Sequence, residues 1–90
     1  MKVEVTKAFE KKVLKIKSQK TKEELLEVIK SIKKAEDLRQ IKNIRPIKGH
    51  KNYYRIVVAD HYRLGIKLVD KIVWLLFFGI RNENTYKLFP

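Results

Sequence analysis

An uninterrupted apolar segment, IVWLLFF from Ile72 to Phe78, places the strongest constraint on the fold of this chain. The apolar run extends only to Ile80, and a helix needs about 20 apolar residues to cross a bilayer, so the segment is not a membrane span. A short run that is apolar at every position is typical of an internal strand with both faces covered. The rest of the chain must therefore supply neighbouring strands and a layer that packs on them.

Three more segments have the pattern of strands. Val3 and Val5 alternate with polar residues, and Tyr53–Val58 and Tyr62–Val69 flank the turn sequence ADH. The pair DK at 70–71 predicts a two-residue hairpin turn before the apolar strand, although the favoured glycine is missing. The last three strands are therefore predicted to be antiparallel.

Two amphipathic helices are predicted after the first strand. Thr6 can cap the first helix, and Thr21 with Glu24 has the spacing of a capping box at the start of the second. The break at 18–20 predicts that the helices form an antiparallel hairpin. Each helix has an apolar face with spacings of three and four residues. These faces comprise Phe9, Val13, Leu14 and Ile16 in the first helix, and Leu25, Val28, Ile29 and Ile32 in the second.

The predicted order is strand, helix, helix and then three strands. Neither helix can bury its apolar face alone, so both must pack on the sheet. This order predicts an α+β fold, β-α-α-β-β-β, in which a two-helix hairpin covers one face of a small, mainly antiparallel sheet. Residues 1–90 form a single domain on this prediction.

Net charge is the strongest functional signal in the composition. Lys and Arg total 22 against 10 Asp and Glu, which gives a formal charge of +12. A positive field of this size attracts polyanions, and nucleic acid is the usual partner of a compact basic domain. A solvated coat of lysines and an acidic protein partner are the alternatives. The chain has no cysteine and no secretion-type leader, so we expect a cytoplasmic protein without membrane association.

The connection between the helices and the last three strands is basic. No Asp or Glu occurs from Leu38 to Ala59. Basic and apolar residues both recur there at every third position, which fits a short helical turn followed by an extended segment. The segment is either an edge that follows a phosphate backbone or an ordinary solvated linker. Its basic residues at this spacing are Arg39, Lys42, Arg45, Lys48 and Lys51.

Two Tyr-Arg pairs flank the predicted turn in the segment YYRIVVADHYRLGIKL. A turn centred on Asp60 sets Arg55 opposite Gly65. It also sets Val57 opposite Arg63, and both arginines then project from the face that the helices leave open. They are diagonal neighbours within about 8 Å, which favours a phosphate between the two guanidinium forks. The alternative is two surface arginines that lie over their neighbours.

Three further residues extend this candidate anion site. Tyr53 has the same outward parity as the arginines and can stack on a base. Arg81 and Tyr86 follow the apolar strand, and the strand end can bring them to the same groove.

Several of these features resemble the RelE/ParE toxins of bacterial and archaeal toxin–antitoxin systems. The most specific is the segment PIKGHKNYYRIVVADHYRLGIKL, and the apolar strand and the closing pattern R-x4-Y-x2-FP agree with it. The N-terminal strand–helix–helix order also matches, so the resemblance extends over the whole chain. It implies a RelE-like fold and the toxin of a type II system, an endoribonuclease that cleaves mRNA in the ribosomal A site.

The resemblance also implies chemistry without a metal or another cofactor. In RelE-type enzymes the 2′-hydroxyl of the substrate attacks the adjacent phosphate, and basic residues and a tyrosine supply acid–base help and charge stabilisation. By motif position, Arg63 corresponds to the arginine that holds the scissile phosphate, and Arg55 to a basic residue of the second strand. Arg81 corresponds to the arginine after the last strand, and Tyr86 to the C-terminal tyrosine.

The implied partners are a cognate antitoxin that wraps the toxin, and the ribosome with its mRNA. We expect the toxin alone to be a monomer that becomes part of a heteromer with the antitoxin. Contacts to RNA are expected from the side chains of Arg45, Lys48, Lys51, Tyr53 and His61.

Two positions depart from the family pattern. Val57 stands where well-studied RelE members have a second basic residue, and Ile80 stands where many relatives have a histidine before the last arginine. The usual general base is therefore missing, and an arginine does not replace it because its pKa stays above about 12. The candidates to take its place are His50, His61, Lys48 and Lys51.

The missing base keeps two alternatives open. One is a ParE-like member of the same fold, which binds and inhibits DNA gyrase without catalysis of its own. The other is a nucleic-acid-binding module without activity.

Overall fold

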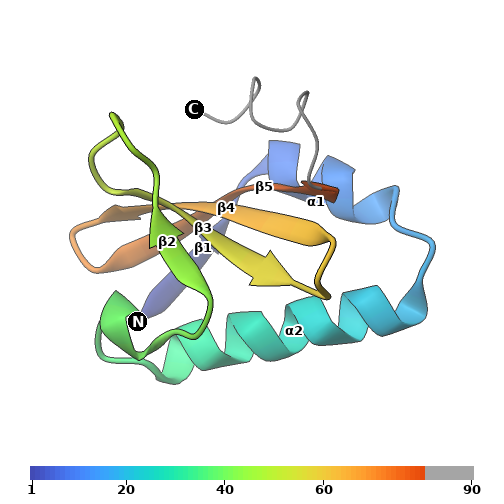
Figure 1. Cartoon of the computed structure of the whole chain (residues 1–90), viewed down its shortest axis with the longest axis horizontal. Helices are drawn as coiled ribbons and strands as arrows, with labels where there is room; N and C mark the ends of the chain where they lie inside the picture. Colours follow the sequence, from blue (N-terminus) through green and yellow to red (C-terminus); the bar gives the residue numbers. More distant parts are fainter. Residues whose placement is uncertain (81–90) are drawn as a thin grey trace.

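The computed structural model describes residues 1–80, which form two α-helices, one short 3-10 helix and a five-stranded sheet (Figure 1). The elements in chain order are β1 (Lys2–Val5), α1 (Lys7–Leu14), α2 (Gln19–Lys34), η1 (Leu38–Gln40), β2 (Ile44–Pro46), β3 (Tyr53–Val58), β4 (Tyr62–Val69) and β5 (Ile72–Ile80). Both predicted helices and all predicted strands are present, and η1 is the predicted helical turn of the basic segment. The α+β fold class is therefore confirmed.

The sheet has the strand order β1-β5-β4-β3-β2. β1 runs parallel to β5, and all other neighbouring strands are antiparallel. The sequence predicts three strands after the helices, whereas the structure has four, because the extended segment after η1 pairs with β3 as β2. Pro46 is compatible with this strand because β2 lies at the edge of the sheet, where one side of the backbone needs no hydrogen-bond donor.

The turn between β4 and β5 has two residues, as predicted. Val69 pairs with Ile72, and Asp70 and Lys71 between them have φ values of 48° and 66°. Positive φ at both turn positions matches the twist of the flanking strands. This turn therefore forms without the usual glycine, and it leads directly into the apolar strand.

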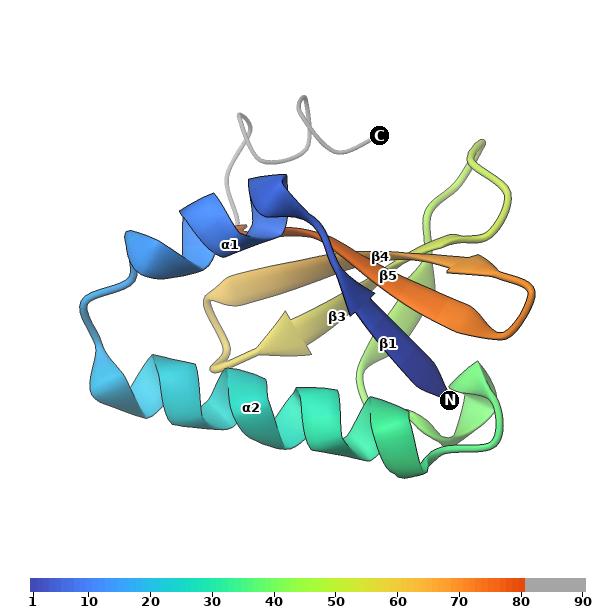
Figure 2. The same cartoon turned by 180° about the vertical axis from the view of Figure 1, so that it is seen from behind.

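The core lies between the helices and one face of the sheet. α2 runs along this face in both views, and its Leu25 and Ile32 are buried (Figures 1 and 2). α1 lies beside the second half of β5, beyond the end of β1, where the rings of Phe9 and Phe78 meet edge-on at a centroid distance of 6.5 Å. The helices run in opposite directions, as predicted, but each packs mainly on the sheet rather than on the other helix.

Neither helix of residues 1–80 is long and apolar enough to span a membrane.

Hydroxyl side chains set the start of both α-helices. Thr6 caps α1, as predicted, because its Oγ1 accepts a hydrogen bond from the backbone N–H of Phe9 at 3.2 Å. The capping box predicted at Thr21 is wrong. Ser18 is the cap of α2, since its Oγ accepts from the backbone N–H of Thr21 at 3.2 Å, and the helix begins at Gln19. Both residues can cap a helix, and the earlier one allows Thr21 to be buried.

β5 is an internal strand, as predicted, with β1 on one side and β4 on the other. Val73 and Leu75 are fully buried, but Trp74 between them is 36% exposed. The expectation that both faces of this strand are covered is therefore wrong at Trp74. The core covers the face of Val73 and Leu75, and Trp74 points to the opposite face.

Candidate nucleic-acid interface on the open sheet face

We name the sheet face opposite the core the open face. Ile56, Leu64 and Ile66 point into the core and are at most 1% exposed, so the residues that alternate with them point to the open face. The open-face residues of the inner part of the sheet are Arg45 of β2, Tyr53, Arg55 and Val57 of β3, Arg63, Gly65 and Lys67 of β4, and Trp74, Phe77 and Gly79 of β5.

The register of the β3–β4 hairpin agrees with the sequence prediction. Arg55 is opposite Gly65, and Val57 is opposite Arg63, so the two arginines are diagonal neighbours on the open face. β2 adds an arginine that the sequence analysis did not position, because Arg45 is directly opposite Arg55. Like charges directly opposite each other in a sheet repel, and an anion between them relieves this repulsion. Three neighbouring strands therefore present arginine to one area of the open face.

Hydrogen bonds to the turn fix the position of Arg63. Its Nη1 donates to the carbonyl oxygen of Asp60 at 3.2 Å and to that of Tyr62 at 3.0 Å. The turn brings the Asp60 carbonyl into place through left-handed backbone at Ala59 and Asp60, with φ values of 50° and 59°. No carboxylate of residues 1–80 forms an ion pair with Arg63. The guanidinium is thus held by neutral acceptors and keeps its full charge for an anion.

The basic segment differs along its length in how its charge is compensated. Arg39 of η1 forms an ion pair with Asp37, with Nη2 and Oδ2 3.2 Å apart. The side-chain hydrogen bond between the two lowers the pKa of Asp37 and raises the pKa of Arg39. Arg45, Lys48 and Lys51 are exposed, and no ion pair joins them to a carboxylate of the described chain. The uncompensated part of the segment is therefore the part beside β3.

The two histidines lie at opposite ends of β3. His50 is in the β2–β3 loop with Lys48 and Lys51, and its ring meets that of Tyr53 edge-on at 6.0 Å. His61 is exposed in the β3–β4 turn, close in sequence to Arg63. The six residues of β3 span roughly 20 Å, so the two histidines cannot act on one phosphate group.

The two positions that depart from the family pattern, Val57 and Ile80, lie on β3 and β5. Val57 is half-buried opposite Arg63, so this open-face position beside the arginine is apolar. Ile80 ends β5 and is exposed. Arg81 and Tyr86 lie outside the described residues, and their predicted roles stay predictions.

Several open-face residues have no role that was expected from the sequence. Lys67 points its Nζ at the ring of Tyr53, 5.0 Å from the centroid. Trp74 is opposite Lys67 on the next strand. α1 adds a cation from the side of the sheet, because the Nζ of Lys12 lies 5.5 Å from the ring centroid of Phe77. Aromatic rings and cations therefore alternate across the open face, which is typical of surfaces that bind single-stranded nucleic acid.

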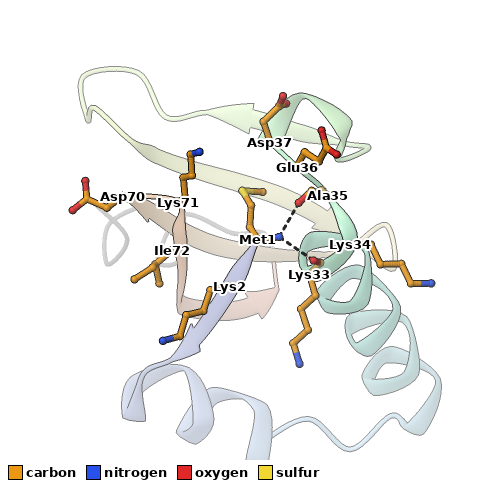
Figure 3. Close-up of a pocket in the computed structure, with 10 residues that line it drawn as sticks. All are labelled: Met1, Lys2, Lys33, Lys34, Ala35, Glu36, Asp37, Asp70, Lys71 and Ile72. Carbon is orange, nitrogen blue, oxygen red and sulfur yellow. Dashed lines mark hydrogen bonds between the residues drawn. The ribbon is translucent and has the colours of Figure 1, made fainter.

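A hollow lies apart from the open face, where β1, the end of α2 and the β4–β5 turn meet (Figure 3). The amino group of Met1 donates there to the carbonyl oxygens of Lys33 and Ala35, at 2.9 and 2.7 Å. These carbonyls belong to the negative C-terminal end of α2. Both signs of charge line the hollow, which therefore lacks the uniform charge of the open face. The charged residues are Lys2, Lys33, Lys34, Lys71, Glu36, Asp37 and Asp70. Residues 1–80 contain no group of three side chains suited to hold a metal ion.

Two helices packed on a five-stranded mixed sheet in this order define the RelE-like fold. A chain of the RelB–RelE antitoxin–toxin complex from Methanococcus jannaschii matches with a TM-score of 0.79 and 26% identity, over 96% of this chain and 98% of that chain. The structural neighbours of the protein are thus RelE and YafQ toxins of type II toxin–antitoxin systems, over nearly its whole length.

Two YafQ structures show the same fold at lower identity. YafQ from E. coli strain BL21(DE3) has a TM-score of 0.63 and 22% identity, over 98% of this chain and 97% of that chain. A chain of the E. coli DinJ–YafQ complex has a TM-score of 0.61 and 22% identity, over 87% of this chain and 90% of that chain. No family sequence profile matches the chain, and no curated protein sequence does either.

Proposed function

We propose that the protein is the toxin of a type II toxin–antitoxin system and acts as a ribosome-dependent endoribonuclease on mRNA. The observation that carries the proposal is the arginine arrangement on the open face. Arg55 and Arg63 are diagonal neighbours in a fold shared with RelE and YafQ, and Arg45 is opposite Arg55. A ribosome-bound substrate implies that the protein acts in the cytoplasm.

In the proposed reaction, arginine side chains supply the positive charge that stabilises the transition state, and no metal ion is required. The 2′-hydroxyl loses its proton and its oxygen forms a bond to the adjacent phosphorus. The bond from phosphorus to the 5′ oxygen breaks, the 5′ oxygen takes up a proton, and a cyclic phosphate and a 5′-hydroxyl result. The dianionic phosphorane between these states is stabilised by arginines that are already in place. Arg63, held by two backbone carbonyls, provides this charge, and Arg55, Arg81 and Tyr86 assist it.

The proton from the 2′-hydroxyl needs an acceptor other than arginine. His61 is the better placed of the two histidines, because it lies in the turn that also holds Arg63, whereas His50 lies at the other end of β3. Arg45, Lys48, Lys51 and Tyr53 hold the flanking RNA in this proposal.

Translation of a reporter mRNA in a cell-free system tests the reaction. We expect ribosome-bound mRNA to be cut at internal positions, with 5′-hydroxyl ends and cyclic or 3′-phosphate ends, because the attacking group is the 2′-hydroxyl. Mapping both ends of the fragments checks this. Fragments with 5′-phosphate ends would contradict the proposed attack.

Val57 favours one alternative, a ParE-like inhibitor of DNA gyrase without catalysis of its own. The position beside Arg63 carries no base, so the open face has charge for binding but no assigned proton acceptor there. The same cell-free reaction separates the two functions when gyrase and plasmid are added. Intact mRNA together with trapped gyrase–DNA breaks would support the ParE-like function and exclude the endoribonuclease.

We further infer an acidic antitoxin partner, with the toxin alone a monomer. The net charge of +12 is poorly compensated within the chain, and two of the structural neighbours were solved as antitoxin–toxin complexes. The antitoxin segment lies across the open face or over exposed apolar helix residues such as Leu14 and Leu26, which are 81% and 54% exposed.

Co-expression with the product of the neighbouring gene is expected to give a complex that co-purifies and relieves growth inhibition. A complex held by the open face should weaken as salt is raised, whereas one held by the apolar helix residues should not. Free expression of the protein without a partner and without growth inhibition would contradict the toxin function.

A further inference from the structure

The rows of the open face differ in their chemistry. One row crosses the sheet from Arg45 through Arg55 and Gly65 to Phe77. The next row consists of Tyr53, Lys67 and Trp74, which are opposite one another on β3, β4 and β5. We name this second row the aromatic row. The two rows are two residues apart along β3 and β4, which corresponds to about 7 Å.

The aromatic row has the composition of a base-stacking platform. Its outer members are aromatic and lie two strands apart, about 10 Å across the sheet. Lys67 between them leans toward β3, with its Nζ 5.0 Å from the ring centroid of Tyr53. The ring of His50 also contacts that of Tyr53, edge-on at a centroid distance of 6.0 Å. The tyrosine ring thus has two neighbouring side chains, and the strand between the two aromatic residues carries a lysine.

Trp74 is the member of the row whose position most needs an explanation. It is 36% exposed, although its neighbours Val73 and Leu75 are fully buried. The helices of residues 1–80 pack on the other face of the sheet, so a large ring here gains little from the core, whereas it offers a flat apolar surface to a ligand. Every base has a π-face that can stack on such a ring, so stacking does not depend on sequence.

The charge around the row selects the ligand class. Lys67 lies within the row, and the adjacent row carries Arg45 and Arg55. The carboxylate that ends the row is Glu4, opposite Trp74 on the edge strand β1, and it forms an ion pair with Lys2 at 3.4 Å. The basic residues around the site thus lie on β2, β3 and β4, and the row ends at β1 with a carboxylate that is paired with Lys2. A strand of unpaired nucleotides matches this order, with phosphate on the arginines and bases on the rings.

We propose that Tyr53, Lys67 and Trp74 form a subsite that stacks an unpaired nucleotide next to the phosphate held by Arg55 and Arg63. The inference rests on the proposed function and names the part of the RNA that the aromatic row takes. It requires single-stranded RNA, because the base faces of a duplex are already stacked on each other. The subsite sets position along the RNA and takes no part in the bond-breaking step.

The chain contains one tryptophan, so its fluorescence reports on this row alone. We expect a short 2′-O-methyl oligoribonucleotide, which cannot be cleaved by 2′-hydroxyl attack, to quench the Trp74 emission in a saturable titration. The same oligonucleotide annealed to its complement should quench much less. Anisotropy of the labelled oligonucleotide measures binding independently of the tryptophan.

Variants then separate stacking from charge. Trp74→Ala should weaken binding about 5- to 150-fold, whereas Trp74→Phe should restore most of it, because a smaller ring still stacks. Lys67→Gln should lower the slope of log affinity against log salt by roughly 0.7, the value for one phosphate contact on a single strand. Lys33→Gln on α2 is the matched control for the loss of one charge, and its slope should stay close to that of the unmodified protein.

The outcomes distinguish the subsite from the proposed function. Quenching of Trp74 without mRNA cleavage in the cell-free system would contradict the proposed endoribonuclease activity but support the stacking subsite. Binding by anisotropy without quenching would overturn the subsite and leave the endoribonuclease in place. An unchanged oligonucleotide affinity in Trp74→Ala, with a weaker antitoxin complex, would assign the row to protein binding instead. If Trp74→Ala does not melt cooperatively, the quenching of Trp74 in the unmodified protein decides by itself whether the aromatic row binds the oligonucleotide.

Discussion

Replacing Arg63 with alanine is expected to abolish growth inhibition without unfolding the protein. Loss of one preorganised donor to a developing oxyanion costs about a hundred- to a thousand-fold in rate. Arg63 contributes little to the core, because its side chain projects from the open face and its hydrogen bonds go to turn carbonyls. The measurements are growth after induction, mRNA cleavage in the cell-free system, and thermal melting.

The controls for this prediction vary the charge and the position. Arg63→Lys keeps the charge but loses the planar fork, so we expect it to recover only part of the activity. Arg55→Ala and Arg81→Ala should each reduce cleavage less than Arg63→Ala does. A folded Arg63→Ala protein that remained fully toxic would show that no phosphate is bound between the two arginines.

Replacing Leu64 with aspartate is expected to unfold the protein. Leu64 is fully buried, and its partners across the sheet are Ile56 and Phe78, both in the core. An unpaired carboxylate there costs several kcal/mol, a large share of the roughly 5–15 kcal/mol by which a domain is stable. Circular dichroism and urea denaturation of the purified variant measure the effect.

The matched control is Leu64→Met, which conserves volume and should cost less than about 1.5 kcal/mol. The comparison with Arg63 is direct, because the two residues are adjacent and point to opposite faces of β4. Cooperative unfolding of Leu64→Asp at the midpoint of the unmodified protein would mean that the assignment of faces on β4 is wrong.

The hairpin register was predictable because apolar alternation fixes it. A shift by one residue would expose Leu64 and Ile66, both of which are fully buried in the structure. The positions of Arg55 and Arg63 followed from this pattern alone. The place of Arg45 did not, because it depends on a loop with left-handed backbone at Gly49 and Asn52, which brings β2 back onto β3.

The face of Trp74 was not predictable from a run that is apolar at every position. Such a run has no period of two, and the sequence alone does not tell which of its residues point to the core. The register also shifts between Gly65 and Ile66, so counting from the end of the run assigns the wrong face on one side of the shift. The start of α2 was missed for a simpler reason, because Ser18 and Thr21 are both good helix caps.

The parallel pairing of β1 with β5 has a consequence for the order of folding. Lys2 pairs with Ile72 and Val5 with Leu75, so the first strand to be synthesised finds its partner only in the last. Contacts this distant along the chain close slowly, because a long loop must be ordered first. A nascent chain can form α2 and the β3–β4 hairpin earlier, but the sheet is completed only after β5 has been synthesised. During translation, Arg55 and Arg63 are therefore synthesised before the complete sheet that holds them in position can form.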